Sequence, residues 1–170
     1  SHRQHASMDA ITQFLPSIPG LLLEKEIQYL SKALHPEKPA VWILGGAKLD
    51  KIGLIHQALQ KADYILIGGA LAFPFLRAKG IQVGMSKCDS SSVELATKIL
   101  TGKDGRKIIL PIDFVAVEKF SATAKTHAVA YNHLSSTQMG LDLGPETVKL
   151  FTAYLRKAKT IVWNGPLGYY

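Results

Sequence analysis

The chain has 170 residues, 47% of them hydrophobic, and a formal net charge of +7. This composition excludes a disordered or collagen-like chain and suffices for one globular domain with a core. The charge is spread evenly, with nine basic and six acidic residues in 1–85 and eleven and seven in 86–170. We therefore expect no nucleic-acid surface, where Lys and Arg cluster, but a potential that attracts small polyanions such as nucleotides.

Signals for membrane insertion or secretion are not recognisable in the sequence. The longest nearly apolar run, 108–117, is interrupted by Pro111 and Asp113 and is shorter than the roughly 20 residues of a transmembrane helix. The first residues lack the charged and then apolar pattern of a signal peptide. Since Cys88 is the single cysteine, a disulfide framework is excluded. We expect a cytoplasmic protein without a membrane partner.

The first predicted element is a helix over about 20–35. Residues 1–19 contain little core-forming material, whereas apolar residues then recur at helical spacing before Pro36 and Pro39 interrupt the pattern. These apolar residues are Leu23, Ile27, Leu30 and Leu34. The helix precedes the remaining elements as a separate unit.

Two strand, turn and helix units follow. An apolar run at 40–44 ends in Gly45 and Gly46, and a second run at 64–67 ends in Gly68 and Gly69. Residues at helical spacing follow each turn: Ile52, Ile55, Leu59 and Ala62 after the first, and Leu71, Phe75 and Ala78 after the second. This alternation predicts an α/β fold with a mostly parallel sheet.

The second half is predicted with more irregular structure. We expect a helix over about 90–100 capped by Ser90 to Ser92, strands at 107–110 and 114–117, and mostly loop over 120–139 with one short strand near Ala128. A helix at about 146–158 and a strand at 160–163 follow. The buried face of that helix is predicted from Val148, Phe151, Leu155 and Ala158.

Glycine turns follow three of the predicted strands, after Leu44, Ile67 and Trp163. In a parallel sheet such turns meet at the carboxyl edge, where backbone N–H groups and helix N-termini favour phosphate. Glycine also simply permits a tight turn, so both interpretations stay open. Neither the Walker motif nor the dinucleotide fingerprint is present. The carboxylates of Asp113, Asp142 and Glu146 could bind Mg²⁺ or cap helices.

Several sequence strings nevertheless resemble one family closely, in order and spacing along all 170 residues. They are His2-Arg3-Gln4-His5-Ala6-Ser7, Ile43-Leu44-Gly45-Gly46-Ala47-Lys48, Asp50-Lys51-Ile52, Ile67-Gly68-Gly69, Leu110-Pro111-Ile112-Asp113, Met139-Gly140-Leu141-Asp142, Gly144-Pro145 and Val162-Trp163-Asn164-Gly165-Pro166-Leu167-Gly168. The family that these strings resemble is phosphoglycerate kinase.

The resemblance implies an enzyme of two Rossmann-like domains that transfers a phosphoryl group reversibly from 1,3-bisphosphoglycerate to Mg-ADP, giving 3-phosphoglycerate and ATP in glycolysis. It implies that 1–19 are the tail of an N-terminal domain for the triose phosphate and that 20–37 are an interdomain helix. Residues 38–170 then form a nucleotide-binding domain, a three-layer sandwich incomplete at its C-terminal end. A monomer is expected.

The resemblance also implies roles for individual residues. Lys48 would contact the transferred phosphoryl group, and Arg3 would bind the triose phosphate; these two are the expected catalytic residues. The expected nucleotide-binding residues are Gly45, Gly46, Ala47, Lys48, Lys51, Gly68, Gly69, Phe120, Gly140, Leu141, Asn164 and Pro166. The Mg²⁺-binding aspartate is expected beyond Tyr170, so the resemblance implies no metal ligand within the chain.

The sequence departs from the family pattern at two positions. Lys48 and Lys51 are spaced K-x-x-K where the family has K-x-x-x-K, and one residue fewer in a helix rotates the rest of that helix by about 100°. Ala70 stands where the family has a third glycine. Because the resemblance covers less than half of a full kinase, we expect a fragment that is inactive alone. The alternatives are an NAD-type Rossmann domain and a non-catalytic nucleotide-binding module.

Overall fold

The computed structural model describes residues 4–46, 52–121 and 123–169. The chain divides into two compact units, 1–34 and 35–170, and each is described by itself. None of the helices in the described ranges is long and apolar enough to cross a membrane.

The first unit consists of a 3₁₀ turn, η1 (Ala10–Gln13), and the helix α1 (Leu21–Leu34). The predicted helix over 20–35 is thereby confirmed. No residue of either element is buried, and the apolar residues at helical spacing stay at least half exposed, for example Ile27 at 50% and Leu30 at 67%. Within this unit α1 forms no core of its own.

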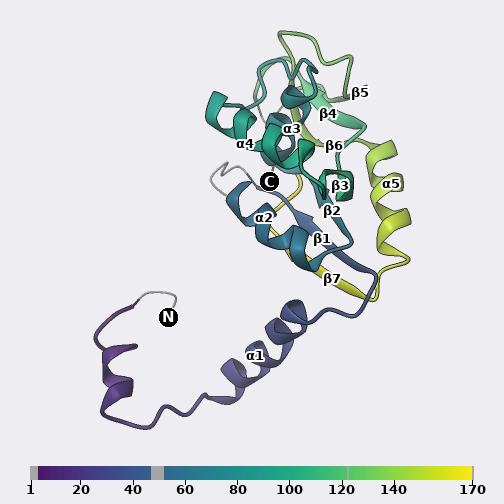
Figure 1. The fold of residues 1–170 in the computed structure, drawn as a ribbon. Helices are drawn as coiled ribbons and strands as arrows, with labels where there is room; N and C mark the ends of the chain where they lie inside the picture. The colour runs from purple at the N-terminus through teal and green to yellow at the C-terminus, as the bar shows by residue number, and fades with distance from the viewer. Residues whose placement is uncertain (1–3, 47–51, 122, 170) are drawn as a thin grey trace. The chain divides into compact units, whose positions relative to one another are not determined.

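The second unit is built on a parallel sheet of four strands in the order β3-β2-β1-β7. The strands are β1 (Ala40–Leu44), β2 (Tyr64–Ile67), β3 (Ile108–Ile109) and β7 (Thr160–Asn164). β1 pairs in parallel with β2 on one side and with β7 on the other. The first strand of the sheet therefore lies beside the last one, as Figure 1 shows in blue and yellow. The predicted parallel α/β fold is confirmed.

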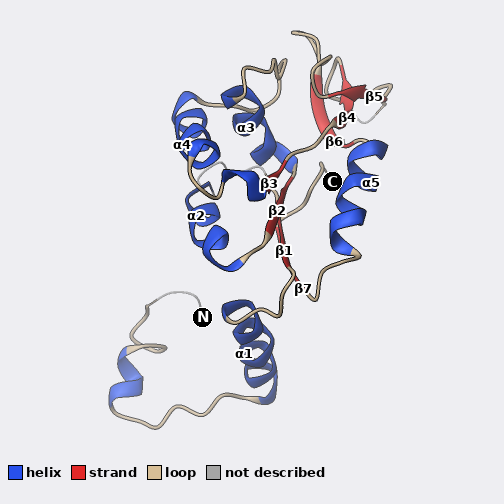
Figure 2. Cartoon of the chain, turned by 45° about the vertical axis from the view of Figure 1, so that its right-hand side comes forward, coloured by secondary structure: helices blue, strands red, loops and turns tan. Residues whose placement is uncertain are grey.

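Helices cover both faces of this sheet, so the unit has three layers (Figure 2). One face carries α2 (Ile52–Lys61), α3 (Ala72–Ala78) and α4 (Ser90–Thr101), with the 3₁₀ turn η3 (Gly69–Leu71) leading into α3. The other face carries α5 (Pro145–Leu155). A short 3₁₀ turn, η4 (Gly105–Lys107), precedes β3.

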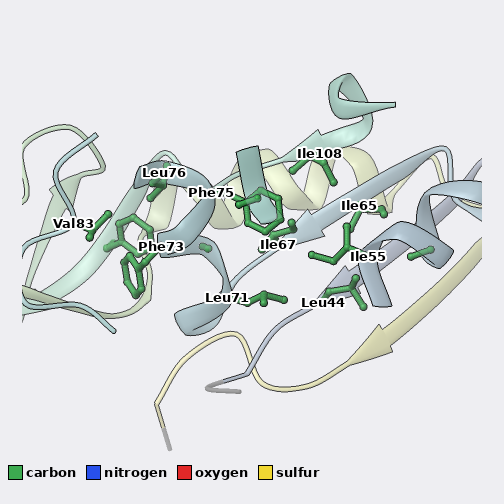
Figure 3. Close-up of a cluster of buried hydrophobic side chains, with 14 of the residues drawn as sticks. Leu44, Ile55, Ile65, Ile67, Leu71, Phe73, Phe75, Leu76, Val83 and Ile108 are labelled. Carbon is green, nitrogen blue, oxygen red and sulfur yellow. The ribbon is translucent and has the colours of Figure 1, made fainter. Parts of the chain in front are cut away.

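Alternate side chains of the strands fill two separate cores. Leu44, Ile65 and Ile67 point toward the larger core, where Ile55 of α2 and Phe75 of α3 meet them (Figure 3). The intervening residues Val41, Ile43 and Leu66 pack instead against Phe151 of α5. This alternation is the period of two expected of a strand that is buried on both faces.

A second sheet is antiparallel, with the order β5-β4-β6. Its strands are β4 (Asp113–Val117), β5 (His127–Ala130) and β6 (Met139–Leu143). β5 confirms the short strand predicted near Ala128, whereas β6 was not predicted. Gly140 and Asp142 are poor strand formers, so pairing with a distant strand decides the conformation of β6.

Two predicted details are wrong. The cap of α4 is Asp89, not the serines: its carboxylate accepts the amide N–H of Ser92 at 2.8 Å and the hydroxyls of Ser91 and Ser92. These hydrogen bonds hold the pKa of Asp89 below its ordinary value. Val148 is 51% exposed, whereas Phe151 is 4% exposed, because α5 turns only its Phe151 side fully onto the sheet.

A partly exposed carboxylate ties the start of β1 to the turn before β2. Asp63 accepts the amide N–H of Ala40 at 2.7 Å and the ammonium group of Lys38 at 2.9 Å. Burial acts to raise the pKa of Asp63, but the hydrogen bond from Ala40 and the charge of Lys38 outweigh it, so the pKa lies below its ordinary value of 3.8. The ionised form therefore stabilises the fold.

We predict that Asp63→Asn, which resembles the protonated acid, lowers the free energy of unfolding by about 1 kcal/mol at pH 7, a small value because solvent screens the pair. Since the folded-state pKa is depressed, this contribution is complete above pH 4 to 5 and is lost as the pH falls through the folded-state pKa. Urea unfolding between pH 7 and 3 measures it. Lys38→Met should lower the free energy of unfolding by a smaller amount, because Lys38 is 58% exposed and the hydrogen bond from the Ala40 amide to Asp63 remains. If the difference in the free energy of unfolding between the wild type and Asp63→Asn does not change with pH, the prediction is wrong.

Candidate functional site

The glycine turns after β1 and β2 and the segment after β7 meet at one edge of the parallel sheet. The Gly45 amide donates to the Asn164 carbonyl, the Gly68 amide to the Leu44 carbonyl and the Gly69 amide to the Leu167 carbonyl, each at 2.9 Å. The structure thus brings together the sequence-predicted residues Gly45, Gly68, Gly69 and Asn164.

The close approach of residues 166 and 167 explains why glycine stands in these turns. A Cβ atom at Gly45 would collide with the carbonyl oxygen of Pro166. Gly69 has a φ of +60°, and a Cβ there would lie 2.8 Å from the Gly46 nitrogen. At Gly68 a Cβ would lie 2.6 Å from Cδ2 of Leu167. Close packing therefore accounts for all three glycines, against backbone at Gly45 and Gly69 and against the Leu167 side chain at Gly68. The amides of these three glycines already donate within the chain.

The segment 164–169 (Asn164 to Tyr169) also reaches the antiparallel sheet. The Tyr169 amide donates to the Leu141 carbonyl at 2.9 Å, and the Tyr169 ring meets the Phe120 ring edge to face, with centroids 4.8 Å apart. Gly140 fits between aromatic rings, since a Cβ there would lie 2.9 Å from Cζ of Phe73. Phe120 and Leu141 are therefore linked to the glycine turns through this one segment, and Gly140 precedes Leu141 in β6.

The turn inside the segment has its own local support. Gly165 has a φ of +87°, a conformation that favours glycine. The indole N–H of Trp163 donates to the Gly165 carbonyl at 2.7 Å, although the Trp163 side chain is largely exposed. Asn164 and Pro166 were predicted as site residues, whereas Leu167 and Tyr169 were not. The string Gly165-Pro166-Leu167-Gly168 was an available signal for Leu167 but not for Tyr169.

Of the carboxylates proposed as Mg²⁺ ligands or caps, Asp113 and Asp142 accept backbone amides. Asp113 caps α5, because its carboxylate accepts the amides of Glu146 and Thr147. Asp142 accepts the Leu143 amide at 2.7 Å. In the part of the chain that the structure describes, no three His, Cys, Asp or Glu side chains gather closely enough to hold a metal ion.

Some predicted site residues cannot be compared with the structure. Arg3, Ala47, Lys48 and Lys51 lie outside the described residues. Gly46, at the last described position before that gap, has a φ of +114° and lies beside Gly69. Gly46 therefore belongs to the glycine cluster.

A family model for phosphoglycerate kinase matches residues 1–170. The chain belongs to the phosphoglycerate kinase family. The phosphoglycerate kinase of Thermosipho africanus is 49% identical over 173 aligned residues, which cover 99% of this chain and 43% of that protein. That of Pseudothermotoga lettingae is 46% identical, covering 99% of this chain and 44% of the relative. The chain thus spans less than half the length of these curated relatives.

Solved phosphoglycerate kinase structures share the fold. The Coxiella burnetii enzyme superposes with a TM-score of 0.82 at 35% identity, over 88% of this chain and 39% of that one. The Pyrococcus horikoshii enzyme gives 0.81 at 28% identity, over 98% of this chain and 44% of its own. The three-layer α/β arrangement is therefore that of the phosphoglycerate kinase family.

We predict a graded loss of stability for alanine at the glycine turns. Gly45→Ala should lower the free energy of unfolding by about 1–3 kcal/mol, because the Pro166 carbonyl is backbone and must move. Gly68→Ala should cost less, since the flexible Leu167 side chain can turn away. Gly20→Ala is the control, because a Cβ there meets no described atom within 4 Å. Urea unfolding followed by circular dichroism measures all three, and equal losses at Gly45 and Gly20 would contradict the packing.

Proposed function

We propose that this chain carries the nucleotide-binding part of a phosphoglycerate kinase. The reaction is reversible phosphoryl transfer between 1,3-bisphosphoglycerate and ADP, giving 3-phosphoglycerate and ATP. The observation that carries the proposal is the convergence of the turns at Gly45, Gly68 and Gly69 with the segment 164–169 at one edge of the sheet. This is the edge where open α/β sheets bind nucleotides.

The two sides of this edge suit the two ends of a nucleotide. Phe120, Leu141 and Tyr169 supply apolar groups and a carbonyl on the side of the antiparallel sheet, which suits a purine base and its ribose. Gly69 lies beside Gly46. We assign base and ribose contacts to Gly68, Gly69, Phe120, Gly140 and Leu141. Asn164 and Pro166 are assigned to a loop over the nucleotide, and the backbone of Gly45, Gly46 and Ala47 is assigned to the lining of the nucleotide site.

We propose that three basic residues bind the negatively charged phosphate groups: Lys48, Lys51 and Arg3. Phosphoryl transfer requires positioning and electrostatic stabilisation more than covalent chemistry. A lysine side chain offers a point charge to the equatorial oxygens of the transferred group. Arg3 would bind the triose phosphate through its planar guanidinium group. Lys51, one residue closer to Lys48 than in the family pattern, is assigned to the nucleotide phosphates.

Mg²⁺ is expected to arrive with the nucleotide. Asp113 is engaged by the amides of α5, and the described carboxylates do not cluster. No step is therefore assigned to an ion held by the described residues.

We further propose that 1–19 belong to the triose phosphate domain, that 20–37 form the interdomain connection, and that 38–170 belong to the nucleotide domain. We also propose that the protein is a cytoplasmic monomer.

The first test is calorimetric titration of the 170-residue chain with Mg-ADP and Mg-ATP, for wild type and Lys48→Ala. We expect measurable binding by the wild type and a loss of about tenfold or more in Lys48→Ala, the cost of one charge-assisted phosphate contact. Lys98→Ala is the matched control, because Lys98 is exposed on α4 and pairs with Glu94. No binding by the wild type at millimolar nucleotide, or NADH binding that ATP does not displace, contradicts the proposal.

A second test concerns turnover. Residues 1–170 match only 43% and 44% of the two curated relatives, so we expect this polypeptide alone to bind nucleotide without converting 3-phosphoglycerate. A coupled assay that follows 1,3-bisphosphoglycerate formation measures this. Turnover above the background of a Lys48→Ala preparation would show that this part of the enzyme is sufficient.

A further inference from the structure

A buried hydrogen-bond cluster ties the start of α5 to the first residue of β4. The Asp113 carboxylate accepts the amide N–H of Glu146 at 2.9 Å and that of Thr147 at 2.7 Å. Asp113 is 6% exposed and Thr147 is fully buried. Gly144, the residue that precedes α5, has no side chain with which to cap it, so the cap comes from another strand.

The Thr147 hydroxyl completes this cluster. It donates to Oδ1 of Asp113 at 2.6 Å and accepts the amides of Ile112 at 2.9 Å and Asp113 at 3.0 Å. A hydroxyl has one hydrogen and two lone pairs, so its capacity is fully used. The Gly144 amide also donates to the Asp113 carbonyl at 3.0 Å. Removal of the hydroxyl would take the acceptor from a buried amide, that of Asp113, and from a partly buried one, that of Ile112.

The strand that leads into this cluster, β6, changes register at Leu141. Next to the cluster, Phe114 pairs with Leu143 and Val115 with Asp142. Beyond it, Ala116 pairs with Gly140, so Leu141 falls between two registers that differ by one residue. Such a bulge redirects a residue out of the ladder, and its loss would turn part of the strand onto the opposite face.

Leu141 is also the residue of β6 that receives the segment 164–169. Its carbonyl accepts the Tyr169 amide at 2.9 Å, and the neighbouring Asp142 carboxyl lies where a Cβ of Gly168 would be. The position of the segment on the antiparallel sheet therefore depends on where the bulge lies.

We propose that Asp113 and Thr147 are positioning residues for the nucleotide site. Their cluster holds the β6 register at Leu143, and this places the bulge at Leu141 and the segment 164–169 against it. The inference rests on the proposed function, because that assigns Leu141, Asn164 and Pro166 to nucleotide. If the cluster only stabilised α5, any equally destabilising change in α5 would affect the site equally.

The test compares Thr147→Val, Thr147→Ser and Phe151→Leu in the full chain. Phe151 lies in the same helix but packs against Val41, Ile43 and Leu66, so Phe151→Leu is the control for a loss of packing in α5. Thr147→Val should weaken Mg-ADP binding about tenfold, the cost of the amides left unsatisfied, while Thr147→Ser and Phe151→Leu bind as the wild type does. Where Thr147→Val does not fold, Asp113→Asn takes its place with the same expected direction.

Amide hydrogen exchange without ligand separates this inference from the proposed function. The Tyr169 amide donates to Leu141 of the antiparallel sheet, whereas the Gly69 amide donates to Leu167 at the parallel sheet. Thr147→Val should accelerate exchange at Tyr169 more than at Gly69, and Phe151→Leu should not. Equal acceleration at both amides, or equal binding losses in Thr147→Val and Phe151→Leu, overturns the positioning role. If the wild type does not bind Mg-ADP, the proposed function is wrong. The exchange rate at Tyr169 relative to that at Gly69 still decides the positioning role, because it is measured without ligand.

Discussion

The pairing of β7 with β1 is the constraint on which the rest of the site depends. It brings the chain that leaves Asn164 directly over the turn at Gly45, where the two backbones approach too closely for any side chain. From there Leu167 reaches Gly69 and Tyr169 reaches Leu141. One segment of backbone therefore joins the parallel sheet to the antiparallel sheet, and the candidate nucleotide site lies along that junction.

Three Asp carboxylates accept hydrogen bonds from backbone amides at the ends of helices and strands in the unit 35–170. Asp113 caps α5 from β4, Asp89 caps α4 from the preceding residue, and Asp63 holds the start of β1. In each case amide groups that the helix or strand leaves without a partner meet a charged acceptor, which is a stronger arrangement than a neutral one. Asp113 is the most buried of the three, and two of the family-like strings, Leu110-Pro111-Ile112-Asp113 and Gly144-Pro145, meet at it.

Local patterns predicted most of the elements because local forces decide them. The apolar runs at 40–44 and 64–67 and the helical spacing after each are properties of short segments, and the structure has β1, β2, α2 and α3 there. β6 was missed because Gly140 and Asp142 do not favour a strand by themselves. Val148 was misplaced because helical periodicity gives a face, whereas the extent of the covering sheet decides how much of that face is buried.

The sequence by itself determined the α/β class, the family and the positions of the glycine turns, because these depend on periodicity and on strings of adjacent residues. Only the tertiary structure decided why those glycines are needed, since the Pro166 carbonyl that excludes a side chain at Gly45 comes from the other end of the unit. It likewise decided that Asp113 is a cap and that Leu141 is a bulge. Both depend on partners more than twenty residues away, and no local pattern encodes which distant strand or helix an amide will meet.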